Sequence, residues 1–153
     1  GRDWFLASGG LDASVVFWQQ SGKGRKVPIA PDFSEDSAAA GGAQLLNPPF
    51  VHSLAYFPDG SLAAGLGDGT IALLEGSKEK KRLRGHAAAV AQVVCTPAGL
   101  ISAGNDLQVM LWSGKEMATR WQHPEKMNWL AFAEQSLCVA DVSNEISLYE
   151  GFV

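Results

Sequence analysis

The chain has 153 residues, of which 46% are hydrophobic and 18% charged, and its formal net charge is −4 at pH 7. These values are typical of a globular protein and exclude chain-wide disorder and a fibrous repeat. The mild acidity argues against non-specific nucleic-acid binding as the main activity, because such binding needs a basic face. Glycine is over-represented, with 17 residues, and predicts many tight turns.

The two cysteines, Cys95 and Cys138, stand among apolar neighbours, with no second Cys or His at a metal-ligand spacing. We interpret them as buried, reduced thiols of an intracellular protein, in the cytoplasm or the nucleus, and we expect no metal and no cofactor. The longest uncharged runs, residues 37–58 and 85–105, are interrupted by prolines and polar residues, so no membrane helix is predicted.

A pattern of two short strands around a Gly-, Asp- or Asn-containing turn occurs four times, at residues 6–18, 62–74, 100–112 and 137–149. In the last three units an apolar strand precedes this hairpin, at residues 51–57, 90–95 and 127–132. A fourth, outer strand is expected between Trp112 and His123. Four strands every ~37 residues correspond to one blade of a β-propeller.

Along the chain, the blade parts are residues 3–20, 44–77, 85–115 and 123–150. The sequence therefore predicts an all-β fold, a partial β-propeller of about three and a half four-stranded blades, whose first unit lacks its innermost strand. The chain opens without a Met, and we expect an open arc of a larger ring, with the remaining N-terminal blades as its partners. Such an arc leaves strand edges exposed, so the chain alone is expected to be poorly soluble or to self-associate.

Residues 21–43 separate the first two units and are rich in Gly, Pro and Ala, which is typical of a flexible interblade insertion. We expect proteolysis to cut here first. Basic residues stand at one end and acidic residues at the other, around Ser34 and Ser37. A phosphoserine switch and a passive linker both fit this pattern, and the passive linker is the simpler interpretation.

A basic run follows the second unit and contains Lys78, Lys80, Lys81, Arg82 and Arg84. One interpretation is an anion patch that binds phosphate, nucleic acid or an acidic partner. The other, which the position between two blades favours, is a solvated outer strand or loop.

The third unit contains Gly85-His86, then Ser102 and Asp106, and its last inner strand ends at Trp112. Through these residues and the repeated hairpins, the sequence resembles the WD-repeat family. The resemblance implies that His86, Ser102, Asp106 and Trp112 form a structural tetrad, hydrogen-bonded in a chain through one blade. In such a chain every buried polar group has a partner, so its loss is expected to loosen a blade and not to abolish a reaction.

The other units keep this pattern in part. The first has the hydroxyl, carboxylate and indole at the matching spacings, in Ser8, Asp12 and Trp18. The second keeps only the carboxylate, Asp68, and its other places hold Asn47, Ala64 and Leu74. The fourth keeps only the histidine, His123, and its other places hold Val139, Ser143 and Tyr149.

The resemblance also implies that one face of the ring binds protein or peptide partners, through residues beside the start of each innermost strand and before the turn Asp. On this chain the candidate partner-binding residues are Phe50, His52, Asn105, Lys126 and Asn128. The alternative is that these are ordinary exposed residues that contact nothing.

A non-catalytic interaction scaffold or adaptor is therefore the expected function. The sequence has no phosphate-binding loop, no Gly-x-Ser-x-Gly motif and no Cys/His pair at a working spacing, so no catalytic residue is predicted. The Trp-Asp-x-Arg signature, with which some WD-repeat proteins join ubiquitin ligases, is missing from the blade ends. The alternatives are a nucleic-acid- or phosphate-associated WD-repeat protein that uses the run 78–84, and a hydrolase on a propeller scaffold.

Overall fold

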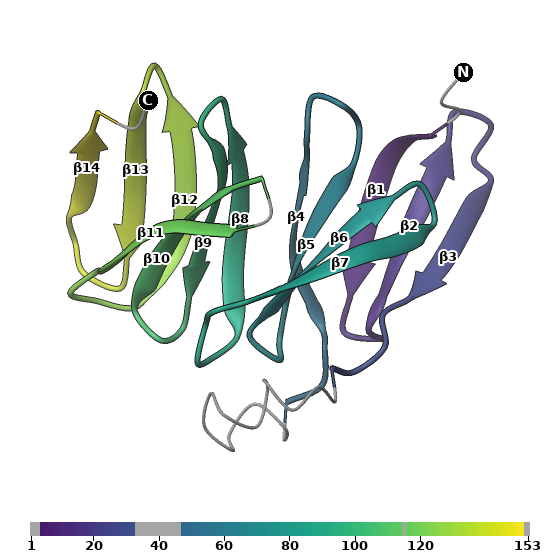
Figure 1. Cartoon of the computed structure of the whole chain (residues 1–153), viewed down its shortest axis with the longest axis horizontal. Coiled ribbons are helices and arrows are strands. Elements are labelled where there is room, and N and C mark those ends of the chain that lie inside the picture. The colour runs from purple at the N-terminus through teal and green to yellow at the C-terminus, as the bar shows by residue number, and fades with distance from the viewer. Residues whose placement is uncertain (1–3, 33–46, 115, 152–153) are drawn as a thin grey trace.

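The computed structural model describes residues 4–32, 47–114 and 116–151. These residues form fourteen strands in four antiparallel sheets (Figure 1). No helix long and apolar enough to span a membrane occurs among them. The predicted all-β fold is confirmed.

Each sheet follows the chain in order, with neighbouring strands hydrogen-bonded. The first sheet contains β1 (Trp4–Gly10), β2 (Ser14–Gln19) and β3 (Gly24–Pro28). The second contains β4 (Val51–Tyr56), β5 (Leu62–Leu66), β6 (Thr70–Glu75) and β7 (Lys78–Arg84). The third contains β8 (Val90–Thr96), β9 (Gly99–Gly104), β10 (Gln108–Ser113) and β11 (Glu116–Gln122). The fourth contains β12 (Met127–Ala133), β13 (Ser136–Asp141) and β14 (Ile146–Glu150).

The sheets stand side by side as blades (Figure 1). An apolar core fills each of the three spaces between them. Successive side chains of a strand point to opposite faces, so an inner sheet supplies residues to both of its neighbours. In β6, for example, Ala72 belongs to the first core and Ile71 to the second. This two-sided burial explains why β5, β6, β9 and β10, the inner strands of the second and third sheets, are mostly apolar.

Within the described residues the two end sheets have only three strands. The first sheet begins with β1, which corresponds to the second strand of the complete sheets, and the fourth ends with β14, which corresponds to their third. The structure is therefore an open arc of about three and a half blades, which confirms the predicted partial propeller.

The outer face of the fourth sheet is apolar and uncovered. Trp129 is 65% exposed, Ile146 74% and Leu148 56%. Trp129 and Ile146 both pair with Ala140 across β13, so they belong to one cross-strand row. Exposed apolar faces of this kind are typical of surfaces that another structural unit covers.

The structure corrects the predicted insertion at residues 21–43. Gly24–Pro28 form β3, which pairs with β2 as the outer strand of the first blade, and Val27 and Ile29 are buried in the first core. Two glycines and a proline around a single buried valine hid this strand, because pairing with β2 and not its own pattern defines it. The rest of the predicted insertion that lies in 33–43, with Ser34 and Ser37, is outside the described residues.

One buried side chain connects the third and fourth blades through the backbone. Gln92 Nε2 donates to the carbonyl oxygen of Leu130 at 2.9 Å, and the Leu130 N–H donates to Gln92 Oε1 at 2.5 Å. Between the second and third blades, the Val93 N–H donates to Ser53 Oγ at 3.1 Å. These contacts fix how β4, β8 and β12 are aligned along their length. The first residues of the three strands therefore lie at the same edge of the arc.

Candidate functional site

The third sheet contains a continuous polar chain from the loop before β8 to the end of β10. Trp112 Nε1 donates to Ser102 Oγ at 2.8 Å, and Ser102 Oγ lies 2.8 Å from His86 Nε2. His86 Nδ1 lies 3.0 Å from Asp106 Oδ1. Every donor is used once if the Ser102 hydroxyl donates to Nε2 and the ring N–H on Nδ1 donates to Asp106. The structure thus brings together all four residues of the predicted tetrad.

Asp106 also accepts hydrogen bonds from two backbone amides of this blade. The Ala87 N–H donates to its Oδ2 at 2.8 Å and the Gln108 N–H to its Oδ1 at 3.2 Å. Burial raises the pKa of Asp106, but the hydrogen bonds from His86, Ala87 and Gln108 outweigh this effect and hold the pKa below the ordinary 3.8. The carboxylate is therefore a structural acceptor.

The first sheet has only part of this hydrogen-bonded polar chain. Trp18 Nε1 donates to Ser8 Oγ at 2.9 Å, as its predicted tetrad role requires. Asp12 is engaged elsewhere, because it accepts hydrogen bonds from Lys26 Nζ at 2.6 Å and from Ser14 Oγ at 2.7 Å. The hydrogen bonds from Lys26 and Ser14 lower the pKa of Asp12.

The fourth sheet has a polar chain that the sequence did not reveal. His123 Nδ1 lies 2.7 Å from the Tyr149 hydroxyl, and His123 Nε2 lies 2.8 Å from Asp141 Oδ2. The predicted carboxylate position fell on Ser143, which is wrong because equal spacing assumes the same turn length in every hairpin. Hydrogen bonds from Ser143 and His123 lower the pKa of Asp141 to about 2. The available signal was Asp141 itself, a carboxylate at the end of the strand before the turn.

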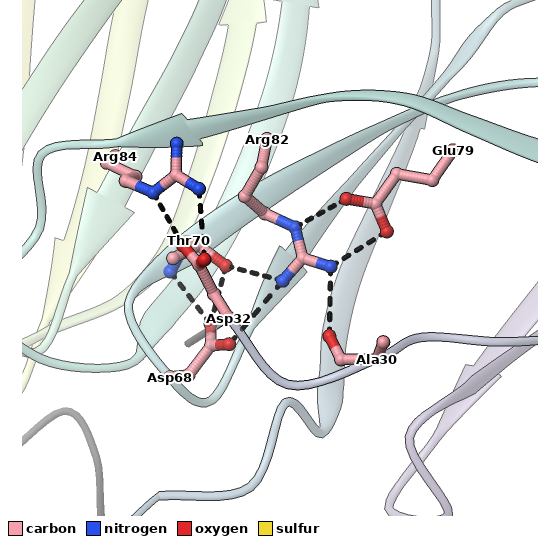
Figure 2. Close-up of polar contacts among 7 residues, drawn as sticks. All are labelled: Ala30, Asp32, Asp68, Thr70, Glu79, Arg82 and Arg84. Atoms are coloured by element: carbon pink, nitrogen blue, oxygen red, sulfur yellow. Dashed lines mark hydrogen bonds and ion pairs between the residues drawn. The ribbon is translucent and has the colours of Figure 1, made fainter. Parts of the chain in front are cut away.

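In the second sheet an arginine takes the place of the histidine (Figure 2). The Asp68 carboxylate accepts the Thr70 N–H at 3.0 Å and the Thr70 hydroxyl at 2.6 Å. Arg82 Nη1 lies 3.5 Å from Asp68 Oδ2 and donates to Thr70 Oγ1 at 3.1 Å. The other guanidinium nitrogens of Arg82 donate to Glu79, at 2.7 Å for both oxygens.

This arrangement gives two cations of the predicted anion patch partners within the chain. The Arg82 side chain is only 8% exposed, and its guanidinium faces Asp68 and Glu79. Arg84 forms a two-point ion pair with Asp32. Carboxylates of the same chain therefore pair with both guanidinium groups, of which that of Arg82 is buried and that of Arg84 is partly exposed. Of the lysines in the run, Lys78 is exposed, Lys80 lies 3.4 Å from Glu75, and Lys81 is half-buried.

The five candidate partner-binding residues lie at one edge of the arc. Strand register pairs Val51 with Leu66, Val90 with Gly104 and Met127 with Asp141. The starts of β4, β8 and β12 therefore lie beside the turns that follow β5, β9 and β13, and we call this edge the rim; it includes residues 50–52, 67–69, 105–107 and 126–128.

Most of these rim residues are accessible. Exposed side chains are those of His52, Asn105, Lys126 and Asn128, whereas Phe50 is half-buried. Asn128 has a local role as well, because its Nδ2 donates to the Asp141 carbonyl oxygen at 3.1 Å. The rim thus presents an imidazole, an ammonium group and carboxamides beside one partly buried aromatic ring.

The described residues hold no group of three or more His, Cys, Asp or Glu side chains arranged for a metal ion. Cys95 and Cys138 are both free thiols. Burial, with a smaller effect of the Asp59 charge, raises the pKa of Cys95 to about 12. The Cys95 thiol therefore stays protonated near neutral pH and is a poor nucleophile.

Comparison with known proteins identifies the fold to which this arrangement of sheets belongs. No family model matches the chain, and no curated protein matches it. Among solved structures it is similar to the WD40 β-propeller domain of Doa1, with a TM-score of 0.71, 18% identity, and coverage of 97% of this chain and 48% of that one. The chain thus spans about half the length of the structure that it matches, and its fold is that of a WD40 β-propeller.

Proposed function

We propose that this chain is a non-catalytic protein-interaction scaffold that binds protein or peptide partners at the rim. The observation that supports this proposal is that Phe50, His52, Asn105, Lys126 and Asn128, which come from three different sheets, share one edge of a WD40-type arc. An aromatic ring, two groups able to carry positive charge and two carboxamides are suited to an extended peptide with acidic and apolar side chains.

We further propose that additional blades of the same protein complete the ring. The apolar outer face of the fourth sheet, with Trp129, Ile146 and Leu148, is the surface that they would cover. The sequence from Gln44 onward resembles the C-terminal half of WD repeat-containing protein 53, and a protein of that kind is the relative we propose. A site of action inside the cell, in the cytoplasm or nucleus, belongs to the same proposal and is supported by the two free thiols.

Affinity capture with rim variants of the intact gene product, followed by mass spectrometry, tests the proposal. His52→Ala combined with Lys126→Ala removes two exposed rim side chains. Arg120→Ala is the matched control, because it removes one cation from an exposed position on the outer strand β11. We expect the rim variant to lose proteins that the wild type and the control both retain, at an unchanged melting temperature. Retention of the same proteins by all three would contradict the proposal.

A further inference from the structure

The segment that follows β3 is attached to the outer strand of the second sheet by two arginines (Figure 2). Arg82 Nη2 donates to the carbonyl oxygen of Ala30 at 3.1 Å. Arg84 Nε donates to Asp32 Oδ2 at 2.5 Å and Arg84 Nη2 to Asp32 Oδ1 at 2.9 Å. The second contact is a fork-to-fork pair, the geometry in which an arginine and a carboxylate hold each other most specifically.

Strand alternation explains why both arginines reach this segment. In β7, Leu83 points into the second core opposite Ile71. Its neighbours Arg82 and Arg84 must then point to the other face, where Arg82 pairs with Ala72 of the first core. That face looks toward the first blade, so residues 29–32, which leave the first blade, pass directly in front of it.

The buried Asp68 carboxylate of the second sheet lacks the hydrogen-bond donors that its counterpart in the third sheet has, so a cation beside it is favourable. In the third sheet, Asp106 faces His86 Nδ1 and accepts a hydrogen bond from the Ala87 N–H, both from the loop before β8. The corresponding residues before β4 are Asn47, which is exposed, and Pro48, which has no N–H. Asp68 Oδ2 accordingly accepts no hydrogen bond within the described part of the chain.

We propose that Arg82 and Arg84 form an internal clamp, which replaces the histidine–aspartate contact in the second blade and fixes residues 29–32 against β7. The connections before β8 and β12 cover only residues 85–89 and 123–126, whereas the connection from β3 to β4 covers residues 29–50. Closing a longer connection costs more conformational entropy, so contacts that fix its first residues contribute more to order between the blades. The clamp, together with the Ile29 N–H that donates to the Ala13 carbonyl oxygen at 2.8 Å, fixes the first residues of the connection.

The clamp gives the basic run a role inside the molecule. Two of its five cations hold an interblade connection, and the exposed lysines Lys78 and Lys80 help to keep an edge strand soluble. This inference does not depend on what the rim binds.

Hydrogen exchange of the intact gene product tests the clamp at the Ile29 amide. Arg84→Met and Asp32→Asn each remove the outer ion pair, which is partly exposed, so that the fold is retained. We expect each to raise the exchange rate at Ile29 about ten-fold while leaving the Leu130 amide, which lies in the fourth blade, unchanged. Lys80→Met is the matched control, since it removes a cation of the same strand whose carboxylate neighbour is Glu75, and it should leave both rates unchanged.

The reversed pair, Asp32→Arg with Arg84→Asp, should bring the Ile29 rate back to within about three-fold of the wild type, because the two side chains couple directly. Three results would overturn the clamp: single variants that exchange like Lys80→Met, a reversed pair no slower than the single variants, or equal acceleration at Ile29 and Leu130, which reports a general loss of stability.

Discussion

Ser102 lies at the centre of the polar chain in the third sheet and has no exposed surface. Its hydroxyl contacts both Trp112 Nε1 and His86 Nε2, each at 2.8 Å. The net free energy of each hydrogen bond is small. The loss of the hydroxyl is nevertheless costly, because a buried polar group that loses its hydrogen-bond partner keeps its full desolvation cost.

Ser102→Ala is therefore expected to lower the free energy of unfolding by about 2–4 kcal/mol, since it removes the hydroxyl that Trp112 Nε1 and His86 Nε2 both contact. Ser113→Ala, at an exposed position at the end of the neighbouring strand β10, is the matched control and should change stability by less than about 0.5 kcal/mol. Chemical denaturation followed by tryptophan fluorescence measures both. Equal effects in the two variants would show that the hydrogen-bonded polar chain contributes nothing to stability beyond local packing.

Asp141 makes the fourth sheet sensitive to acid. Its pKa is about 2 in the folded protein, against an ordinary 3.8, because Ser143 and His123 donate to the carboxylate. A lowered folded-state pKa contributes stability that is complete above about 3.8 and is lost as the pH falls toward about 2. Asp141→Asn should thus be less stable than the wild type at pH 5, and the difference should shrink on acidification to pH 2.

Unfolding curves at several pH values measure this convergence. Glu145→Gln, which alters an exposed carboxylate in the following turn, serves as the control and should follow the wild type throughout. A stability difference between Asp141→Asn and the wild type that does not depend on pH would argue against an ionised Asp141 in the polar chain.

At the scale of strands and sheets, Gln92 is the residue that joins two elements. Its carboxamide pairs with both backbone groups of Leu130, in the way that a neighbouring strand would. Gln92→Leu keeps the volume but leaves a buried N–H and a buried carbonyl without partners, so we expect a loss of about 3 kcal/mol. Thermal unfolding measures it, with the exposed Gln122→Leu of β11 as control. A loss no larger than that of the control would remove Gln92 from the interblade contact.

The strands that the sequence predicted well are those whose pattern reports burial on both faces. β5, β6, β9 and β10 are apolar, end at Gly-, Asp- or Asn-containing turns, and recur at a constant spacing, so local pattern and tertiary environment agree. β3 was missed because a single residue, Val27, carries its burial. The sequence pattern of an outer strand is weak wherever one neighbour supplies most of its contacts.

The site residues divide in the same way. The tetrad of the third sheet was predictable because four residue types recur at a known spacing, whereas Asp141 was hidden by a turn of different length. The sequence pattern places Arg82 in a surface charge run, and nothing in the linear sequence pairs it with Asp68. Only the register of β6 with β7 brings that pair together, and register is a long-range property.

For the molecule as a whole, the decisive feature is that the arc has ends. Inside the arc each sheet is covered on both faces, but the outer face of the fourth sheet leaves Trp129, Ile146 and Leu148 in solvent. Burying three such side chains is worth several kcal/mol at roughly 1.5–3 kcal/mol each. A surface of this kind is expected to bind another unit, either a further blade of the same protein or, in its absence, another copy of the chain.

Sedimentation velocity of the isolated chain, compared with a Trp129→Lys and Ile146→Lys double variant, tests the open-arc account most directly. We predict association of the wild-type chain that grows with concentration, and a monomeric double variant whose unfolding free energy is nearly unchanged, because both side chains already lie in solvent. A wild-type chain that stays monomeric at every concentration would contradict the open arc.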